Sequence, residues 1–258
     1  MTSKLGIIQS RGLGDILIAL PIAEYYHREG YEVYWPICDE FFPSVKDSVP
    51  WVHWIPLVPD SRGLFFYDTP RERLRNLGVK PEDILCLYQS LSSQPELSSV
   101  PWFQIQSFDQ FKYTRAGVPF LNKWRLKHCL QRDLDREQTL YDRLVQNEHY
   151  YVTHFQGSSY TAEPDLSYIP QDWQRIDVDE NRTESIFDWL TVLSKATAII
   201  CVDSAVSNLV DQMQILGPDL YWIPRSHIHL TPILGSSWTV LDPPPGTLAA
   251  QKIWGSSR

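Results

Sequence analysis

A polar turn between an apolar run and a helical pattern, close to the amino end, is the feature that most constrains the fold. Residues 5–8 form a short apolar run that predicts a buried strand of a parallel sheet, and the helical pattern continues to about residue 29. Gly12 and Gly14 permit a tight turn between the two elements. Residues 32–35 begin a second strand. We therefore predict a βαβ opening, in which ligands gather at the carboxyl ends of strands and at helix N-termini.

The turn differs from a dinucleotide-binding fingerprint, and its distinctive residue is Asp15. Leu17 stands where the pattern G-x-G-x-x-G requires its third glycine. The second strand offers no acidic residue at Trp35 to bind a ribose hydroxyl. A carboxylate at a helix start can cap the helix, or it can face a substrate as a general base. The residues alone leave both interpretations of Asp15 open.

The same layout recurs near the other end of the chain. Residues 186–195 carry apolar residues at helical spacing, and residues 197–202 form a β-branched, apolar run that predicts a buried strand. Asp203 and Ser204 then lead into another helical pattern. Helix, strand, polar turn and helix in this order indicate an α/β domain. The chain therefore carries two strand-to-helix turns, each with an Asp.

Length and composition place the chain among globular proteins. Its 258 residues are 43% hydrophobic and 21% charged, enough to bury the core of one large domain or two compact ones. Arg11 and Asp15 interrupt the apolar residues at the amino end, so we predict neither a signal sequence nor a transmembrane segment and expect a cytoplasmic protein. The four cysteines are far apart and form no C-x-x-C pair, which predicts neither a disulfide framework nor a metal site.

A polar stretch at residues 146–148 precedes the strand predicted at 150–154, and we place a domain boundary there. The two domains then comprise residues 1–148 and residues 149–258. The first domain contains four further predicted elements: strands at 52–57 and 84–88, a helix at 70–77, and a long amphipathic helix from about residue 123 or 133 to 145.

Positive charge is concentrated in residues 112–132, which contain six Lys or Arg residues and no Asp or Glu although the net charge of the chain is −8. Tyr113, Phe120 and Trp124 are interleaved with these cations. Such a segment can bind an anionic acceptor, such as a lipid phosphate, a charged glycan or nucleic acid. It can equally be a solvated helix face that acidic residues elsewhere neutralise.

Taken together, the two turns resemble glycosyltransferase family 9, the ADP-heptose:lipopolysaccharide heptosyltransferases. The amino domain of that family begins with a G-D-x-x-x-x-x-P element, which Gly14, Asp15 and Pro21 match. Its carboxyl domain carries a D-[ST]-G-x-x-H element after a strand, and the corresponding residues begin at Asp203 and end at Asn208. The resemblance implies an α/β fold of two facing Rossmann-like domains, the GT-B arrangement, in a compact version.

Three departures from the family pattern concern the donor side. Ala205 replaces a glycine that lets the backbone approach the donor, and Asn208 replaces an ionisable histidine. The loop at 153–161, where the family has a basic residue near the donor diphosphate, has hydroxyl groups but no Lys or Arg. The resemblance assigns donor binding to nine residues: Gly14, Gln156, Gly157, Ser158, Asp203, Ser204, Ala205, Ser207 and Asn208.

The function implied is that of an inverting, metal-independent glycosyltransferase, which moves a sugar from a nucleotide diphosphate donor to an acceptor hydroxyl of glycan or lipopolysaccharide type. Asp15 is the candidate general base that removes the hydroxyl proton. The helix N-terminus near Ser204, with Ser207 or Asn208, can stabilise the departing diphosphate, while Asp203 can bind sugar hydroxyls. No cofactor is expected beyond the nucleotide-sugar, which is a co-substrate.

The acceptor is expected to be anionic and to lie beside the basic segment, with Arg11, Lys123, Arg125 and Lys127 as candidate contacts. Two other functions remain open. A viral-type DNA-base glycosyltransferase would dock duplex DNA on residues 112–132 and show salt-sensitive binding. A non-catalytic nucleotide- or glycan-binding protein would explain the departures on the donor side.

Overall fold

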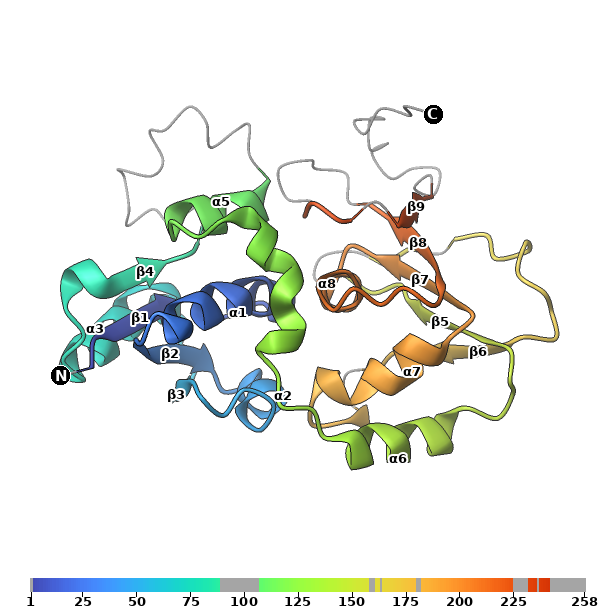
Figure 1. Ribbon diagram of the computed structural model, residues 1–258, viewed down its shortest axis with the longest axis horizontal. Helices are drawn as coiled ribbons and strands as arrows, with labels where there is room; N and C mark the ends of the chain where they lie inside the picture. Colours follow the sequence, from blue (N-terminus) through green and yellow to red (C-terminus); the bar gives the residue numbers. More distant parts are fainter. Residues whose placement is uncertain are drawn as a thin grey trace.

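The computed structural model describes residues 2–88, 107–157, 161–162, 164–179, 182–224, 232–235 and 237–241. Within these residues the chain forms two sheets with helices packed around them, and the two halves lie side by side (Figure 1). The neighbouring strands of both sheets run parallel. The α/β class predicted from alternating buried runs and helical patterns is therefore confirmed.

The amino half contains a four-stranded sheet with the order β3-β2-β1-β4. Its central strand β1 pairs with β2 through Lys4 and Glu32 and with β4 through Gly6 and Ile84. The elements of this half are β1 (Lys4–Ile8), α1 (Leu13–Arg28), β2 (Glu32–Cys38), α2 (Phe42–Lys46), β3 (His53–Leu57), η1 (Leu64–Phe66), α3 (Asp68–Asn76), η2 (Pro81–Asp83) and β4 (Ile84–Cys86). The predicted strands and helices of this half are confirmed to within two residues.

The carboxyl half contains a five-stranded sheet with the order β6-β5-β7-β8-β9. Strand β5 lies beside β7, with His154 opposite Cys201, so the carboxyl ends of both strands meet at the same edge of the sheet. The elements of this half are β5 (Tyr150–His154), β6 (Gln174–Asp177), η6 (Ile186–Trp189), α7 (Leu190–Lys195), β7 (Ala198–Val202), α8 (Ala205–Gln212), β8 (Asp219–Ile223) and β9 (Trp238–Val240).

Among the described residues between the two sheets, three further helices occur: α5 (Phe108–Arg115), η4 (Phe120–His128) and α6 (Leu134–Leu144). The first of the two predicted starts for the long helix, at residue 123, is wrong, because η4 is a 3₁₀ helix with a kink at Trp124. Helix α6 starts after Asp133, whose side chain accepts a hydrogen bond of 3.0 Å from Arg136 N. An Asp that caps a helix in this way begins a new element, which separates α6 from η4.

Of these three helices, one lies between the two halves. The helix η4 packs against both α1 and α8 and runs between the two halves (Figure 1). Helix α6 packs against η6 and α7, which belong to the carboxyl half. The boundary near residue 148 stays a prediction, and the contacts of α6 favour a division before that helix.

The two halves share a hydrophobic core. The middle of helix α1 is apolar on all sides, and residues 16–23 are all buried. A helix of this composition is stable only when it is covered on every face. One continuous cluster joins Ile7 and Leu17 of the amino half to Val152 and Leu209 of the carboxyl half. No helix in the described part of the chain has both the length and the apolar character needed to cross a membrane.

Candidate functional site

The structure brings the two polar turns together. Helices α1 and α8 start at these turns and pack against each other. A Cβ atom added to Gly14 would lie 3.5 Å from the backbone of Ala205 and 3.6 Å from Asn208 Nδ2. These distances are ordinary van der Waals contacts, so the start of α1 at Gly14 lies directly against the start of α8. Three predicted donor residues, Gly14, Ala205 and Asn208, are therefore neighbours.

Asp15 lies in the first turn of α1, but it does not cap the helix. The N-cap position belongs to Gly12, which has a φ of 85°, and no side chain caps this helix. The capping interpretation of Asp15 is therefore wrong. Its side chain is instead 38% exposed, and its Oδ1 accepts a hydrogen bond of 2.9 Å from Lys112 Nζ. A carboxylate in the first turn is also favourable because it faces the positive end of the helix dipole.

Lys112 is the partner that the sequence analysis missed. It is only 2% exposed and lies on α5, far from Asp15 in the sequence. Its ammonium also donates to Gln9 Oε1 at 2.6 Å and to the carbonyl oxygen of Leu87 at 3.0 Å. Its neighbours Phe111 and Tyr113 are also buried, so this end of the basic segment is covered. Their apolar character was the only sign in the sequence that Lys112 is buried.

The turn before α1 is held from the first sheet. The hydroxyl of Tyr88 accepts a hydrogen bond of 2.9 Å from Arg11 N and lies 3.0 Å from Ser10 Oγ. Burial raises the pKa of Tyr88 well above its ordinary value of 10. The Ser10 hydroxyl in turn donates to the carbonyl oxygen of Phe65 at 2.6 Å. The backbone next to Gly12 is therefore fixed by neutral side chains from other segments.

Several polar groups of the carboxyl turn bind one another. Ser204 is the N-cap of α8 and forms a capping box with Ser207, whose Oγ accepts from Ser204 N at 3.0 Å. Asn208 donates through Nδ2 to the carbonyl oxygen of Ser204 at 2.9 Å. Asn208 is 2% exposed, and its Oδ1 has no hydrogen-bond partner among the described residues. This oxygen is an acceptor that could receive a ligand hydroxyl.

His154, at the end of β5, is a second residue that the sequence analysis missed. Its Nδ1 lies 2.9 Å from Ser204 Oγ. Burial lowers the pKa of His154 to about 4, so the ring is neutral at neutral pH. The parallel pairing of β5 with β7 places this ring beside the start of α8. A strand order cannot be read from one sequence, so this neighbour could not be anticipated.

The remaining donor candidates lie around this edge of the second sheet. Asp203 follows β7 and is 2% exposed, with its backbone N–H bound to the carbonyl oxygen of Ile223 at 3.1 Å. Gln156 is exposed and forms a bridge with Thr161, and Gly157 is partly exposed. Ser158 lies outside the described residues.

A cation of a neighbouring strand, Arg175, lies next to the loop at 153–161. Arg175 of β6 lies over the ring of Phe155, with 5.4 Å from its guanidinium carbon to the ring centre. It also donates through Nη2 to Asp177 Oδ1 at 2.7 Å, and Asp177 accepts a hydrogen bond from Thr153. Asp177 ends the second strand of this sheet, the place where a Rossmann-like half presents an acid to a ribose. In the first half, the strand β2 offers no such acid at Trp35.

The four acceptor candidates do not form one basic surface. Arg11 is paired with Glu40 at 3.1 Å, and Arg125 Nη2 lies 3.8 Å from Glu24 Oε1. Lys127 is exposed. Lys123 has no exposed side-chain surface and therefore offers no contact to an acceptor.

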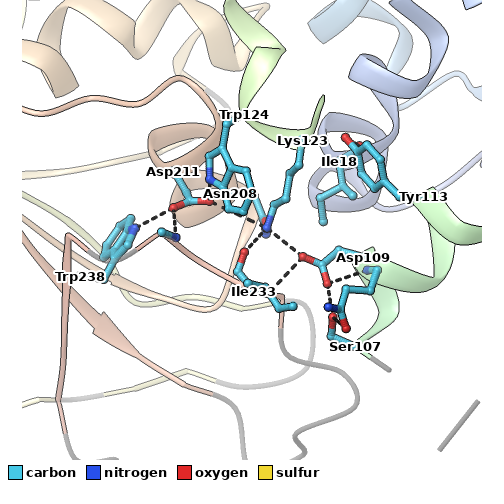
Figure 2. A network of polar contacts seen from close by, with 12 residues as sticks. Ile18, Ser107, Asp109, Tyr113, Lys123, Trp124, Asn208, Asp211, Ile233 and Trp238 are labelled. Atoms are coloured by element: carbon cyan, nitrogen blue, oxygen red, sulfur yellow. Dashed lines mark hydrogen bonds and ion pairs between the residues drawn. The ribbon is translucent and has the colours of Figure 1, made fainter. Parts of the chain in front are cut away.

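Lys123 instead connects the two halves through a buried polar network (Figure 2). Its ammonium lies 2.8 Å from Asp109 Oδ2 and 3.8 Å from Asp211 Oδ2, and it donates to the carbonyl oxygen of Ile233. Asp211 also accepts from the indole N–H groups of Trp124 and Trp238, at 2.9 Å and 3.2 Å. Burial raises the pKa of Asp211, while Lys123 opposes that shift. The network therefore attaches η4 to α8 and to the segment before β9.

The two cavities described lie away from the turns. One has a volume of about 340 Å³ and is lined by residues of α7 and of the segment after α8, with Arg132 at its rim. The other has a volume of about 390 Å³ and lies between α6 and residues 182–184. No group of three or more His, Cys, Asp or Glu side chains suited to a metal ion occurs within the described ranges.

Comparison with solved structures identifies the fold. The family 9 glycosyl transferase from Veillonella parvula DSM 2008 matches with a TM-score of 0.53 and 11% identity, covering 93% of this chain and 85% of that one. E. coli ADP-heptose lps heptosyltransferase II matches with a TM-score of 0.54 and 12% identity, covering 97% and 94%. No protein-family model matches the sequence, and no curated protein is similar enough to match it.

A third match extends over a smaller part of its relative. The dodecameric iron-containing heptosyltransferase TibC from enterotoxigenic E. coli H10407, in complex with ADP-D-beta-D-heptose, has a TM-score of 0.56 and 11% identity. The match covers 92% of this chain and 62% of TibC. The chain thus has the fold of family 9 heptosyltransferases, with two Rossmann-like domains in the GT-B arrangement, as the sequence analysis predicts.

Proposed function

We propose that this chain, which has the fold of family 9 glycosyltransferases, transfers a sugar from a nucleotide diphosphate donor to an acceptor hydroxyl, with Asp15 as the general base. The observation that carries the proposal is the meeting of the two turns. A half-exposed carboxylate on α1 lies one residue from Gly14, which is itself in contact with the start of α8. General-base chemistry and anion binding are thus brought together.

The reaction follows from these groups. Asp15 accepts the proton of the acceptor hydroxyl, whose oxygen forms a bond to the anomeric carbon. The bond from that carbon to the diphosphate breaks, and its electron pair leaves with the diphosphate. Attack from the side opposite the leaving group inverts the anomeric centre. The N-terminus of α8 faces the developing negative charge, and this is where backbone N–H groups lower the barrier most.

The donor is proposed to bind chiefly to the carboxyl half. One of the similar proteins, TibC, is described in complex with an ADP-sugar, which makes an ADP-sugar the first donor to test. We assign the ribose hydroxyls to Asp177, by its place at the end of β6, and a sugar hydroxyl to Asn208 Oδ1. The neutral ring of His154 adds no charge beside Ser204.

The test has two stages. First, a panel of nucleotide diphosphate sugars is screened by thermal shift, because a ligand that binds only the folded state raises its melting temperature. Transfer is then measured with the best donor, with and without a chelator, for the parent protein and for Asp15→Asn. We expect the variant to bind the donor but to lose about 10²- to 10⁴-fold in rate, and the chelator to have no effect.

A matched control distinguishes the loss of a general base from the loss of any carboxylate in the first turn of a helix. Asp68 is an exposed acid in the first turn of α3, so Asp68→Asn removes a comparable charge without touching the two turns. Its rate should equal that of the parent. Transfer by Asp15→Asn at the parent rate would show that Asp15 is not the base. Donor binding without transfer by the parent would favour the non-catalytic alternative.

The DNA-base alternative receives less support from the structure. Two of the six cations in residues 112–132, Lys112 and Lys123, are buried, and Arg125 and Arg132 lie beside Glu24 and Glu137. The segment is therefore not the exposed basic surface that duplex DNA requires. Strong, salt-sensitive binding of duplex DNA would restore this alternative.

A further inference from the structure

Lys112 is held in one place by groups other than Asp15. An ammonium has three N–H donors, and the acceptors of Lys112 are Asp15 Oδ1, Gln9 Oε1 and the carbonyl oxygen of Leu87. Gln9 follows β1 and Leu87 follows β4, so two neighbouring strands fix the cation. All three donors therefore have a partner, and the ammonium has no remaining freedom to turn toward solvent.

The amide of Gln9 is itself oriented. Gln9 is completely buried, and its Nε2 donates to the carbonyl oxygen of Arg11 at 2.9 Å. This bond turns Oε1 toward Lys112. The backbone carbonyl of Gln9 accepts from Trp35 Nε1 at 3.0 Å, which holds the residue in place. Residues at the ends of two strands thus fix the position of the Lys112 ammonium independently of Asp15.

Gly12 restricts the same carboxylate from the other side. A Cβ atom at position 12 would lie 2.8 Å from Asp15 Oδ2, closer than such atoms approach in proteins. Its φ of 85° also suits glycine alone. One oxygen of Asp15 is therefore bound to Lys112, and the other lies over a residue that has no side chain.

We propose that Lys112 is a positioning residue for Asp15: it binds Oδ1 so that Oδ2 is the oxygen that accepts the proton of the acceptor hydroxyl, in space that Gly12 leaves open. This inference rests on the proposed function. Lys112 does not touch the acceptor, and it gains or loses no proton in the reaction. Its contribution is to keep the base in one rotamer, and a displaced catalytic group costs rate even when its chemistry is intact.

The experiment compares Lys112→Met with Lys123→Met. Both variants remove the charge of a buried lysine from the same basic segment, but Lys123 contacts Asp109 and Asp211 rather than Asp15. We expect Lys112→Met to lower kcat by about tenfold to a hundredfold while the KM for the donor changes little. The same substitution in an Asp15→Asn background should cause no further loss. An equal loss in both backgrounds would overturn the proposal.

A second measurement does not depend on activity. Three-bond NMR couplings report the side-chain rotamer of Asp15, which we expect to be single in the parent and averaged in Lys112→Met, and unchanged in Lys123→Met. If Lys112→Met does not fold, Gly12→Ala replaces it in this measurement. This variant retains Lys112, and its methyl group should displace the Asp15 carboxylate. Unchanged Asp15 couplings in the folded variants would overturn the positioning role. Absence of transfer by the parent, with averaged couplings in Lys112→Met, would overturn only the proposed function.

Discussion

The two strand-to-helix turns have the same layout but hold their polar groups by different means. In the carboxyl turn, Ser204, Ser207 and Asn208 bond to one another within one turn of α8. In the amino turn no side chain caps α1, and Asp15 is bound by Lys112, which lies on another helix. The bonds of the carboxyl turn join residues that are close in the sequence. The bond between Asp15 and Lys112 joins residues that are far apart in the sequence, so it forms only when the chain folds.

This difference suits the two turns to different roles, one to binding and the other to proton transfer. A helix start whose side chains hold one another is rigid, which suits binding of a diphosphate at the helix N-terminus. A carboxylate with one oxygen held and its side chain partly in solvent can still exchange a proton. Four predictions test the comparison, in order of decreasing expected effect.

The largest effect concerns pH and the carboxyl turn. Burial lowers the pKa of His154 from 6.5 to about 4, so between these pH values the unfolded chain binds a proton that the folded chain does not. The free energy of unfolding should therefore fall as the pH drops from 6.5 to 4, by up to about 3 kcal/mol. Urea denaturation across this range, with His154→Gln as control, measures the effect. An equal slope in both proteins would show that His154 is not responsible.

The second effect concerns the charge pair of the amino turn. Asp15→Asn leaves the buried Lys112 ammonium without its carboxylate, which should lower the free energy of unfolding by about 1–3 kcal/mol. The effect is below that of a fully buried pair because solvent reaches Asp15. Adding Lys112→Met to Asp15→Asn should recover part of the loss. Urea denaturation of the single and double variants tests this, and additive losses would contradict it.

The third effect concerns the cap of α8. Ser204→Ala removes an N-cap side chain and should lower the free energy of unfolding by about 1 kcal/mol. Thermal melts would detect this change, and Ser194→Ala, at an exposed position, is the control. Because the amino turn has no side-chain cap, it has no corresponding substitution. A stability unchanged in Ser204→Ala would show that the capping box contributes little.

The smallest effect concerns the contact between the turns. Gly14→Ala places a methyl group at ordinary contact distance from Ala205, and alanine is favoured over glycine in a helix. Stability should therefore change by less than about 1 kcal/mol. Donor binding should weaken, because the methyl group occupies the space between the turns. A calorimetric titration with the donor found in the panel measures this. Unchanged affinity would place the donor elsewhere.

The fold was predictable from local patterns. Buried strands such as residues 150–154, and helices such as residues 70–77, were found within two residues, because apolar periodicity reflects which side of an element is covered. The amphipathic pattern allowed the long helix to start at either residue 123 or residue 133, so the break between η4 and α6 was not predicted. It depends on how Asp133 caps the second helix, which the amphipathic pattern does not reveal.

The candidate site was predictable only in part. Gly14, Ala205 and Asn208 were singled out by the resemblance to family 9 motifs, and the structure brings them together. His154 and Asp177 were not singled out, because their proximity to the second turn depends on which strands pair. The donor and acceptor roles of these residues remain predictions.

The sequence by itself determined the α/β class and the two polar turns, since apolar spacing and turn residues act over a few positions of the chain. Only the tertiary structure decided what each charge in residues 112–132 does. Lys112 and Lys127 are both lysines of one basic segment, yet one is buried against Asp15 and the other is exposed. The burial and the partner of a charge depend on distant segments that fold over it, and that information is absent from its neighbours in the chain.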